Sequence, residues 1–217
     1  SIGDIVHNHL AQYGSMENLP DKVAIHINDT HPTLAIPELM RILLDECGYG
    51  WEKAFDITSR TFAYTNHTVM SEALEKWNEE IFRKTLPRIY SIVCEMNRRC
   101  REDFEKKFPG DTGKINYMAI LGDGQVRMAN ICCYVCHSIN GVSKLHSEII
   151  KQSVFHDYYL YSPRKFTNVT NGIAYRRWLL ASNPGLTSLL SEAIGDGFKK
   201  DASRLKMLEE YRDDKSV

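Results

Sequence analysis

The sequence predicts an α/β protein that is rich in helix and contains a short parallel sheet and a β-hairpin. Three observations predict this class. Short apolar runs bounded by polar residues are typical of buried parallel strands, and apolar residues at helical spacing follow those runs. Two further short apolar segments flank Gly122-Asp123-Gly124, where glycines suit the turn of a hairpin. Strands that alternate with helices along a chain favour an α/β fold.

The first elements read as strand, helices, strand. Val23–Ile27 is nearly all apolar, and we expect it to be a strand covered on both faces of the sheet. The next helix tolerates Pro37 in its first turn and ends before Gly48. Another helix begins near Trp51 and leads into a second buried strand over residues 61–65. Such a unit predicts two parallel strands.

The middle of the chain predicts two long amphipathic helices and the hairpin. Apolar residues recur at helical spacing over residues 74–87 and again over residues 89–104, with charged residues between them. Residues 118–121 then face residues 125–128 across the glycine-containing turn.

The remaining elements are shorter. Residues 131–137 predict a buried helix, Asn140-Gly141 predicts a break, and Val142 begins an amphipathic helix that reaches Ile150. Residues 166–170 predict a strand, and helical segments follow from Trp178 onward, separated by a turn at Asn183-Pro184-Gly185.

Composition excludes several classes of protein. The chain has 217 residues, of which 43% are hydrophobic and 25% charged, and these values exclude a disordered, collagenous or coiled-coil chain. With 27 Lys+Arg against 28 Asp+Glu, no overall cationic field attracts nucleic acid or an anionic membrane. No apolar run is long enough to span a bilayer, and residues 1–9 lack the basic region followed by an apolar region that is typical of a signal peptide. We therefore expect a cytoplasmic protein that binds neither nucleic acid nor a membrane.

Polar clusters follow both predicted strands of the first unit. Asn28-Asp29-Thr30-His31 comes after the first strand, and Asn66-His67-Thr68 comes after the second. Carboxyl ends of parallel strands share one edge of a sheet, where the ligands of α/β proteins bind. Asp29 is suited to orienting a histidine, while the two histidines and Asn66 offer donors and acceptors for hydroxyl groups.

Two other interpretations of these clusters stay open. Asp29, Thr30, Asn66 and Thr68 are residue types that often cap helices, so they could be structural. The occurrence of two clusters at matching strand ends favours a binding site. A metal site is disfavoured, because the histidines show no HExxH spacing and a site for alcohols needs no ion.

The cysteines and remaining basic residues are weaker candidates. Cys133 and Cys136 form a CxxC that could be redox-active or half of a zinc site, but no second pair occurs, and apolar neighbours favour buried, reduced thiols. We interpret His137 and His146 as structural. Arg176-Arg177 suits either an anion or a solvated helix face.

Four ordered blocks resemble the glycogen and maltodextrin phosphorylases. The first is VAIHINDTHPTLAIPELMR at residues 23–41, and the second is AYTNHTV at residues 63–69. The third is NGVSKLHSEI at residues 140–149, and the fourth runs from Lys165 through Asn171-Gly172-Ile173 to Leu179. Long blocks in the family's order are far more specific than a single short motif.

This resemblance implies a function. It implies retaining phosphorolysis of α-1,4-glucans by phosphate, releasing glucose 1-phosphate, with pyridoxal phosphate as cofactor. His67 matches the family histidine that serves the 6-hydroxyl of the bound glucose and the charge that develops in the transition state. Asn171 matches an asparagine that hydrogen-bonds the same sugar, and Val142 matches a contact near it.

The resemblance implies further roles around the sugar. Asp29 and His31 match residues that line the pocket near the anomeric carbon, and Glu75 with Ala73 matches the segment that borders it. Trp178 matches a tryptophan packed beside the cofactor. The family's cofactor-bearing lysine lies in a segment with no counterpart in these residues.

Domain organisation also follows from the resemblance. Residues 1–170 correspond to the C-terminal part of the family's N-terminal domain, and residues 171–217 to the first segments of its C-terminal domain, within a two-domain Rossmann-like glycosyltransferase architecture. We therefore expect an internal fragment of an allosteric-family enzyme, inactive alone. The complete enzyme is expected to be a homodimer. Unpaired strand edges predict self-association of the fragment.

An alternative is a free-standing, non-catalytic glucan-binding module. Such modules normally present exposed aromatic side chains to the sugar. Trp51, Trp77 and Trp178 lie within apolar helical patterns, so we expect them to be buried, and this expectation disfavours the alternative.

Overall fold

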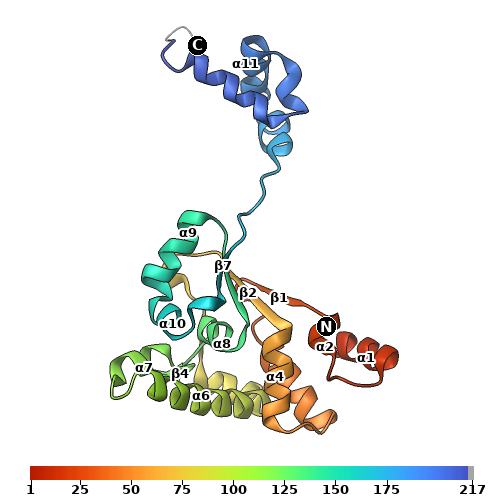
Figure 1. Ribbon diagram of the computed structural model, residues 1–217, viewed down its shortest axis with the longest axis vertical. Helices are drawn as coiled ribbons and strands as arrows, with labels where there is room; N and C mark the ends of the chain where they lie inside the picture. Colours follow the sequence, from red (N-terminus) through yellow and green to blue (C-terminus); the bar gives the residue numbers. More distant parts are fainter. Residues whose placement is uncertain (215–217) are drawn as a thin grey trace. The chain divides into compact units, whose positions relative to one another are not determined.

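The structure is a computed structural model that describes residues 1–214. It contains two compact units, the first from Ser1 to Thr170 and the second from Asn171 onward. The first unit has a four-stranded parallel sheet, a three-stranded antiparallel sheet and many helices (Figure 1), which confirms the predicted α/β class. Assignment of the two units to particular phosphorylase domains remains a prediction.

Strands and helices of the described residues have the following bounds. The strands are β1 (Ile25–Asn28), β2 (Phe62–Asn66), β3 (Lys76–Asn78), β4 (Leu121–Gly122), β5 (Gln125–Arg127), β6 (Ser138–Gly141) and β7 (Phe166–Asn168). The α-helices are α1 (Ile2–Tyr13), α2 (Leu19–Lys22), α3 (Ala35–Arg41), α4 (Trp51–Thr61), α5 (Glu79–Thr85), α6 (Pro87–Lys107), α7 (Thr112–Met118), α8 (Met128–Val135), α9 (Lys144–Ile149), α10 (His156–Tyr161) and α11 (Pro184–Ile194).

Shorter or wider helical turns extend several of these helices. The π-helical segments are η1 (Ile42–Glu46), η3 (Ile150–Val154) and η5 (Arg176–Ala181). The 3₁₀ segments are η2 (Ser71–Ala73), η4 (Pro163–Lys165), η6 (Asp196–Lys199) and η7 (Ala202–Tyr211).

The main sheet has the order β1-β2-β6-β7, and all three pairings are parallel. The register aligns Ile27 with Tyr64 and Tyr64 with Ile139. The prediction that the first two strands are parallel neighbours is confirmed. Their carboxyl ends therefore leave the same edge of the sheet, together with those of β6 and β7.

Within residues 1–170, helices cover one face of this sheet, and the other face is largely exposed at β1. Ile27, Tyr64 and Ile139 are buried on one face, whereas His26 and Asn28 on the other side of β1 are exposed. The expectation that the first strand is covered on both faces is therefore wrong. Alternation of side chains along a strand sends His26 and Asn28 away from the core, and the apolar run alone did not show which face is solvated.

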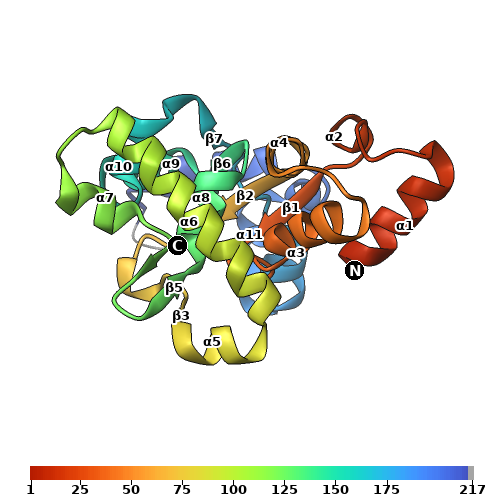
Figure 2. The same cartoon turned by 90° about the horizontal axis from the view of Figure 1, so that it is seen from below.

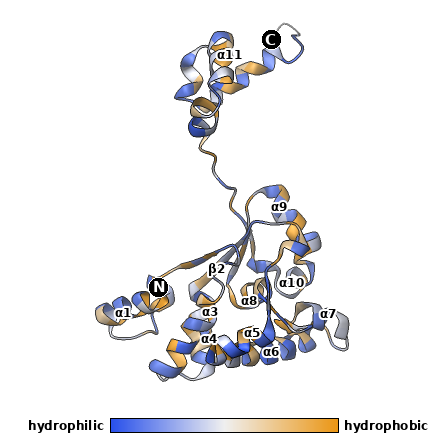
Figure 3. Ribbon diagram, turned by 180° about the vertical axis from the view of Figure 1, so that it is seen from behind, coloured by the Kyte–Doolittle hydropathy of each residue, from blue (hydrophilic) through white to orange (hydrophobic). Residues whose placement is uncertain are grey.

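The helices cover the apolar face. Helices α4 and α8 pack against β2 (Figure 1), and the long helix α6 runs beneath them in contact with α3, α5 and α7 (Figure 2). Hydrophilic and hydrophobic residues alternate along α6 (Figure 3), as expected for a helix with one buried stripe. That stripe consists of Ile89, Ile92, Val93, Met96, Cys100 and Phe104.

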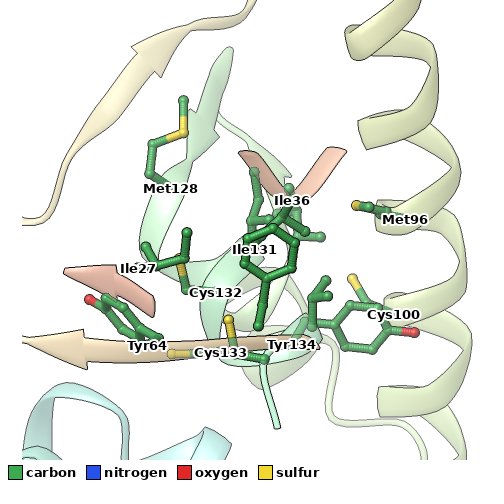
Figure 4. Packing of buried hydrophobic residues seen from close by; sticks show 14 of the residues in the cluster. Ile27, Ile36, Tyr64, Met96, Cys100, Met128, Ile131, Cys132, Cys133 and Tyr134 are labelled. Carbon is green, nitrogen blue, oxygen red and sulfur yellow. The ribbon is translucent and has the colours of Figure 1, made fainter. Parts of the chain in front are cut away.

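The centre of the core is formed by α8 and its neighbours. Figure 4 shows Ile131 and Cys132 of α8 beside Ile27, with Tyr64 of β2 close by. All four side chains are almost completely buried. The predicted buried helix at residues 131–137 is confirmed in its main part, but it runs from Met128 to Val135, and His137 lies outside it and is exposed.

The middle of the chain differs from the prediction. Residues 74–78 were expected to be helical, but residues 76–78 form β3, which pairs with β5. Backbone pairing with β5 overrides a helical spacing that rested on few apolar residues. The hairpin is confirmed but shorter, because Met118 ends α7 and Met128 begins α8.

Helix α8 ends at Val135, so the predicted break in the helix is confirmed, but the strand at Asn140-Gly141 was missed. These residues belong to β6, which lies between β2 and β7 in the sheet. A turn dipeptide within a four-residue strand hides the strand from pattern analysis, because the apolar signal rests on Ile139 alone.

The second unit is held by hydrogen bonds around a small core. Phe198 is fully buried, and the Tyr175 hydroxyl donates to its carbonyl at 3.2 Å. The Arg176 guanidinium donates to the carbonyls of Lys199 and Lys200, both at 2.8 Å. Arg176 thus stabilises this unit itself, which is a third role beside the anion site and the solvated face considered from the sequence.

No helix within residues 1–214 is both long and apolar enough to cross a membrane.

Candidate functional site

The structure brings the two predicted polar clusters together at the carboxyl edge of the sheet. His67 lies directly after β2, and its Nε2 is 2.6 Å from the Oδ1 of Asn28, the last residue of β1. With an amide oxygen as acceptor, the imidazole donates from Nε2 and leaves Nδ1 available. The ring is exposed, so this nitrogen is accessible to a ligand.

Asp29 continues the chain beyond β1 in an unusual conformation. Its φ of 60° lies in the left-handed region, which aspartate tolerates better than most residues. Its N–H donates to the Thr65 carbonyl at 2.9 Å, and its Oδ1 accepts from the Thr30 N–H at 2.7 Å. The second oxygen is 3.8 Å from His31 Nε2, which is longer than a hydrogen bond. Asp29 therefore shapes the loop without fixing the His31 ring.

Glu75 connects the loop after β1 to the segment after β2. Its Oε2 accepts from the Thr30 hydroxyl at 2.9 Å, and its Oε1 accepts from the Trp77 indole N–H at 2.9 Å. Its carbonyl accepts from the Met128 N–H at 3.1 Å. Glu75 also lines a cavity of about 400 Å³ with Arg127 and other polar side chains. The carboxylate is thus anchored on both oxygens.

The polar residues of the β2 loop support each other and cap no helix. Asn66 is fully buried, and its Oδ1 accepts from the Thr68 N–H at 3.0 Å. The Thr68 hydroxyl accepts from the Met70 N–H at 3.1 Å. The helical segments after the two clusters begin after Leu34 and Met70, which have no capping side chain. The helix-capping interpretation is therefore not supported.

Sequence reasoning placed Asn28 in a polar cluster but missed its contact with His67, and it missed the contacts of Asn140 altogether. Asn28 orients His67, and Asn140 accepts from the Val169 N–H at 2.6 Å and donates to Thr65 at 3.3 Å. A signal was available in the sequence, because each strand of the main sheet carries an asparagine at or next to its carboxyl end. These residues are Asn28 in β1, Asn66 in β2, Asn140 in β6 and Asn168 in β7.

The remaining predicted site residues are placed as follows. Val142 is half-buried just after β6, and His31 is exposed in the loop after β1. Asn171 and Trp178 belong to the second unit, and both are exposed. The structure does not place the second unit relative to the first, so it gathers only the residues of the first unit into one site.

Two tryptophans expected to be buried are exposed. Trp77 has 36% of its surface exposed and Trp178 has 59%, while Trp51 is half-buried. Trp77 lies in β3 and not in the predicted helix, so its ring covers less of the core than the helical pattern suggested. The Arg177 guanidinium lies over the Trp178 ring, 5.1 Å from its centroid.

Comparison with known proteins decides the family. The family model described as Carbohydrate phosphorylase matches residues 1–217. Glycogen phosphorylase of Bacillus subtilis is 51% identical over 215 residues, which is 99% of this chain and 27% of that protein. The brain form from Rattus norvegicus is 50% identical over 203 residues, and the muscle form from Bos taurus is 46% identical over 205 residues. These matches cover 92% and 93% of this chain and 24% of each relative.

The chain belongs to the carbohydrate phosphorylase family. It spans about a quarter of the length of the curated relatives it matches. The resemblance seen in the four sequence blocks is thereby confirmed at the level of the family. The activity of the complete relatives is a proposal for this chain.

The cysteines of this phosphorylase chain are not among the residues of the candidate site, although Cys132 lies 3.3 Å from the Thr33 hydroxyl in the loop after β1. All six are free thiols, as predicted, and Cys132, Cys133 and Cys136 are buried with α8. Burial raises the pKa of Cys133 and Cys136 well above the usual 9.0. Such thiols are protonated and inaccessible at neutral pH, which fits a packing role. Among residues 1–214, no three or more His, Cys, Asp or Glu side chains are arranged to hold a metal ion.

Neither Lys165 nor Trp178 by itself forms a site for pyridoxal phosphate. That cofactor needs a lysine for its Schiff base and donors for its phosphate group. Lys165, whose pKa burial lowers, donates from Nζ to the carbonyls of Cys133 and Tyr134 at 3.2 and 2.6 Å. This ammonium supports the end of α8 and is not a free amine. Trp178 is exposed and cannot hold a charged cofactor alone. We therefore derive no chemical step through the cofactor.

Proposed function

We propose that this chain supplies the sugar-binding edge of an α-1,4-glucan phosphorylase. In this proposal the complete enzyme cleaves a glycogen or maltodextrin chain with phosphate and releases glucose 1-phosphate, using pyridoxal phosphate. Roughly half of the residues are identical to those of proteins named glycogen phosphorylase, which supports this reaction over others in the family.

One observation carries the assignment of the site. Two adjacent parallel strands end in polar loops that meet, with His67 held by Asn28 and with Thr30 held by Glu75. Both contacts join residues far apart in the sequence. A preorganised set of neutral donors and acceptors at the carboxyl edge suits a ligand rich in hydroxyl groups.

Roles within the site follow from exposure and hydrogen bonding. His67 is the proposed catalytic residue, because its exposed ring has a free Nδ1 edge and a backbone carbonyl beside it. We propose Asp29, His31, Val142 and Asn171 as contacts to the sugar. Glu75 was predicted to bind substrate, and its two anchored oxygens favour a role in holding the loop at the border of the pocket.

Phosphate and the cofactor complete the proposed reaction. The resemblance assigns the cofactor lysine and the phosphate-binding residues to segments with no counterpart among these 217 residues, while Trp178 is the proposed contact to the cofactor. Without groups that position phosphate and stabilise charge, the transition state loses most of its stabilisation. We therefore expect residues 1–217 alone to be inactive.

The test compares residues 1–217 with the polypeptide encoded by the complete reading frame. Pyridoxal phosphate absorbance and phosphorolysis of maltodextrin are measured on both. We expect only the complete polypeptide to bind the cofactor and to release glucose 1-phosphate. His67→Ala in that polypeptide should lower kcat by about 100-fold, because the lost group acts on the transition state.

A matched control is His7→Ala on α1, far along the chain from the strand ends and exposed. This variant should keep the kcat of the unaltered enzyme. An unchanged kcat with a raised KM in His67→Ala would reduce His67 to a residue that binds the ground state only.

A second candidate is a non-catalytic glucan-binding module. The exposure of Trp77 and Trp178 removes the objection that the tryptophans are buried. Binding of maltodextrin by residues 1–217 in isothermal titration, combined with no phosphorolysis by the complete polypeptide, would favour the module. Homodimerisation of the complete enzyme, self-association of residues 1–217 and a cytoplasmic location remain predictions.

A further inference from the structure

His146 is a buried histidine that the proposed reaction does not use. It lies in the first turn of α9, with only 8% of its surface exposed. Its N–H donates to the Ser143 hydroxyl at 3.0 Å, so the backbone at this position is fixed by the cap of the helix. The backbone that carries the His146 ring is therefore held in place by the helix cap.

Both nitrogens of the His146 ring contact backbone groups of the strand-end loops. Nδ1 accepts from the Val142 N–H at 3.0 Å, and Nε2 is 3.2 Å from the Thr68 carbonyl oxygen. A backbone N–H can only donate and a carbonyl can only accept. These contacts require a neutral ring with its proton on Nε2, so the surroundings select one tautomer.

These two contacts continue the connection between β2 and β6 beyond the sheet. The last aligned pair of the two strands is Asn66 with Gly141. Past this pair, His67 and Val142 follow the strands, and no ladder hydrogen bonds hold them in register. The His146 ring spans this gap, because it contacts Val142 on one side and the residue after His67 on the other.

We propose that His146 is a positioning residue that fixes His67 relative to Val142. This inference rests on the proposed function only in that His67 and Val142 are the sugar-contacting residues. The physical reason is geometric. A ring bonded at both edges resists changes in the separation of the two loops, and a displacement of about 1 Å in a catalytic group can cost about 100-fold in rate.

Other side chains at this position satisfy only part of the arrangement. A glutamate could accept from the Val142 N–H, but an ionised carboxylate has no proton to donate to the Thr68 carbonyl. An asparagine oxygen reaches roughly where Nδ1 lies, and a glutamine nitrogen reaches roughly where Nε2 lies. His146→Asn should therefore keep the bond to Val142, and His146→Gln should keep the bond to Thr68.

The experiment uses these two variants and His146→Phe in the complete polypeptide. The first measurement is amide hydrogen exchange followed by mass spectrometry. We expect the peptide that contains Val142 to exchange faster in His146→Gln, and the peptide covering residues 67–70 to exchange faster in His146→Asn. His146→Phe should speed both. The control is His156→Phe on α10, which should change neither segment.

The second measurement is the steady-state rate of maltodextrin phosphorolysis. We expect His146→Phe to lower kcat by about 100-fold with little change in KM, and the two amide variants to lie between it and the unaltered enzyme. If His146→Phe does not fold, the opposite exchange patterns of His146→Asn and His146→Gln still test whether the His146 ring holds the two loops.

The proposal is overturned if both amide variants exchange like the unaltered protein in both segments, or if their kcat values are unchanged while exchange rises. Exchange needs no activity, so it tests the contacts even if the complete polypeptide shows no phosphorolysis. Failure of the proposed function and failure of this inference are therefore distinguishable.

Discussion

At the carboxyl edge of the main sheet, His67 and His31 are exposed and Asp29 is half-buried, whereas Cys133 and Cys136 near α8 are almost completely buried. Both regions concentrate side chains that are capable of chemistry. Side-chain hydrogen bonds across 39 and 45 residues hold the strand-end loops in place while leaving the histidines accessible. Around α8, desolvation keeps the thiols protonated.

The difference shows that reactive residue types do not make a site by themselves. A site needs accessible groups held in position, and the strand-end loops achieve this with polar contacts at the surface. The core achieves rigidity by packing, at the cost of reactivity. Four predictions test this contrast, beginning with the largest expected effect.

Thiol labelling should separate the cysteines by accessibility. We expect Cys47 and Cys94, which are half-buried, to react with a thiol reagent in the native protein. Cys132, Cys133 and Cys136 should react at least about a thousandfold more slowly, because the reagent reaches them only when the core opens. Mass spectrometry of labelled peptides measures both rates. Rapid labelling of Cys136 in the native state would show that the CxxC is accessible and would break the contrast.

Substitution of Gly141 should disrupt the strand-end loops more than any polar change. A Cβ at this position would lie 2.3 Å from the Ser147 hydroxyl oxygen and 2.8 Å from the Ser147 Cα. Because backbone cannot yield easily, Gly141→Ala should lower the free energy of unfolding by about 3 kcal/mol, measured by urea denaturation. It should also abolish the bond between Asn168 and the Gly141 carbonyl.

The matched control is Gly172→Ala, where a Cβ would meet no atom within 4 Å. This variant should change the free energy of unfolding by less than about 0.5 kcal/mol. Equal effects of the two substitutions would mean that the close approach of α9 to β6 is unimportant for stability.

Alkaline pH should destabilise the protein through its buried thiols. Burial raises the pKa of Cys100 from 9.0 to about 12, and raises those of Cys133 and Cys136 well above 9.0. The unfolded chain releases these protons first, so stability is fully present below pH 9.0 and is lost as the pH rises toward the folded values. Each thiol removes up to about 1.4 kcal/mol per pH unit in this window.

Urea denaturation at pH values below and above 9.0 measures this loss. In Cys100→Ala, the free energy of unfolding should fall less steeply with pH, because one buried thiol is absent. Lys165 acts in the opposite direction, because its folded pKa lies below 10.5, but it is one group against three. A free energy of unfolding that stays constant above pH 9.0 would contradict the burial of these thiols.

Loss of one contact of Glu75 should have the smallest effect. Glu75→Gln keeps the size of the side chain, but its amide nitrogen cannot accept a hydrogen bond, so either Thr30 or Trp77 loses its acceptor. The expected loss is about 1 kcal/mol in the free energy of unfolding, with faster hydrogen exchange in residues 71–77. Glu72→Gln, exposed in the same segment, is the control and should change neither quantity. Equal behaviour of the two variants would remove Glu75 from the set of residues that hold the loops.

Much of the fold could be predicted because the residue pattern within a single segment indicates whether that segment forms a helix, a strand or a turn. The apolar stripe of α6, the glycine turn between β4 and β5 and the apolar residues of β2 each reflect a local period that burial imposes. The position of the candidate site followed from the same logic, because parallel strands deliver Asp29 and His67 to one edge of the sheet.

Other features depend on partners that are distant in the sequence. Strand β3 exists because β5 pairs with it, and β6 becomes a strand because β2 and β7 lie on either side. Local patterns gave a helix and a break at these places, and ladder hydrogen bonds outweigh such weak preferences. The exposure of His26 on an open sheet face has the same origin.

By itself, the sequence determined the α/β class, the edge of the sheet where the polar residues gather, and the family, because each rests on the order and spacing of residues along the chain. Only the tertiary structure decided that Asn28 holds His67, that Glu75 holds Thr30, and that His146 spans two loops. Hydrogen bonds act over about 3 Å, and the residues that make these contacts are 39, 45 and 78 positions apart in the chain.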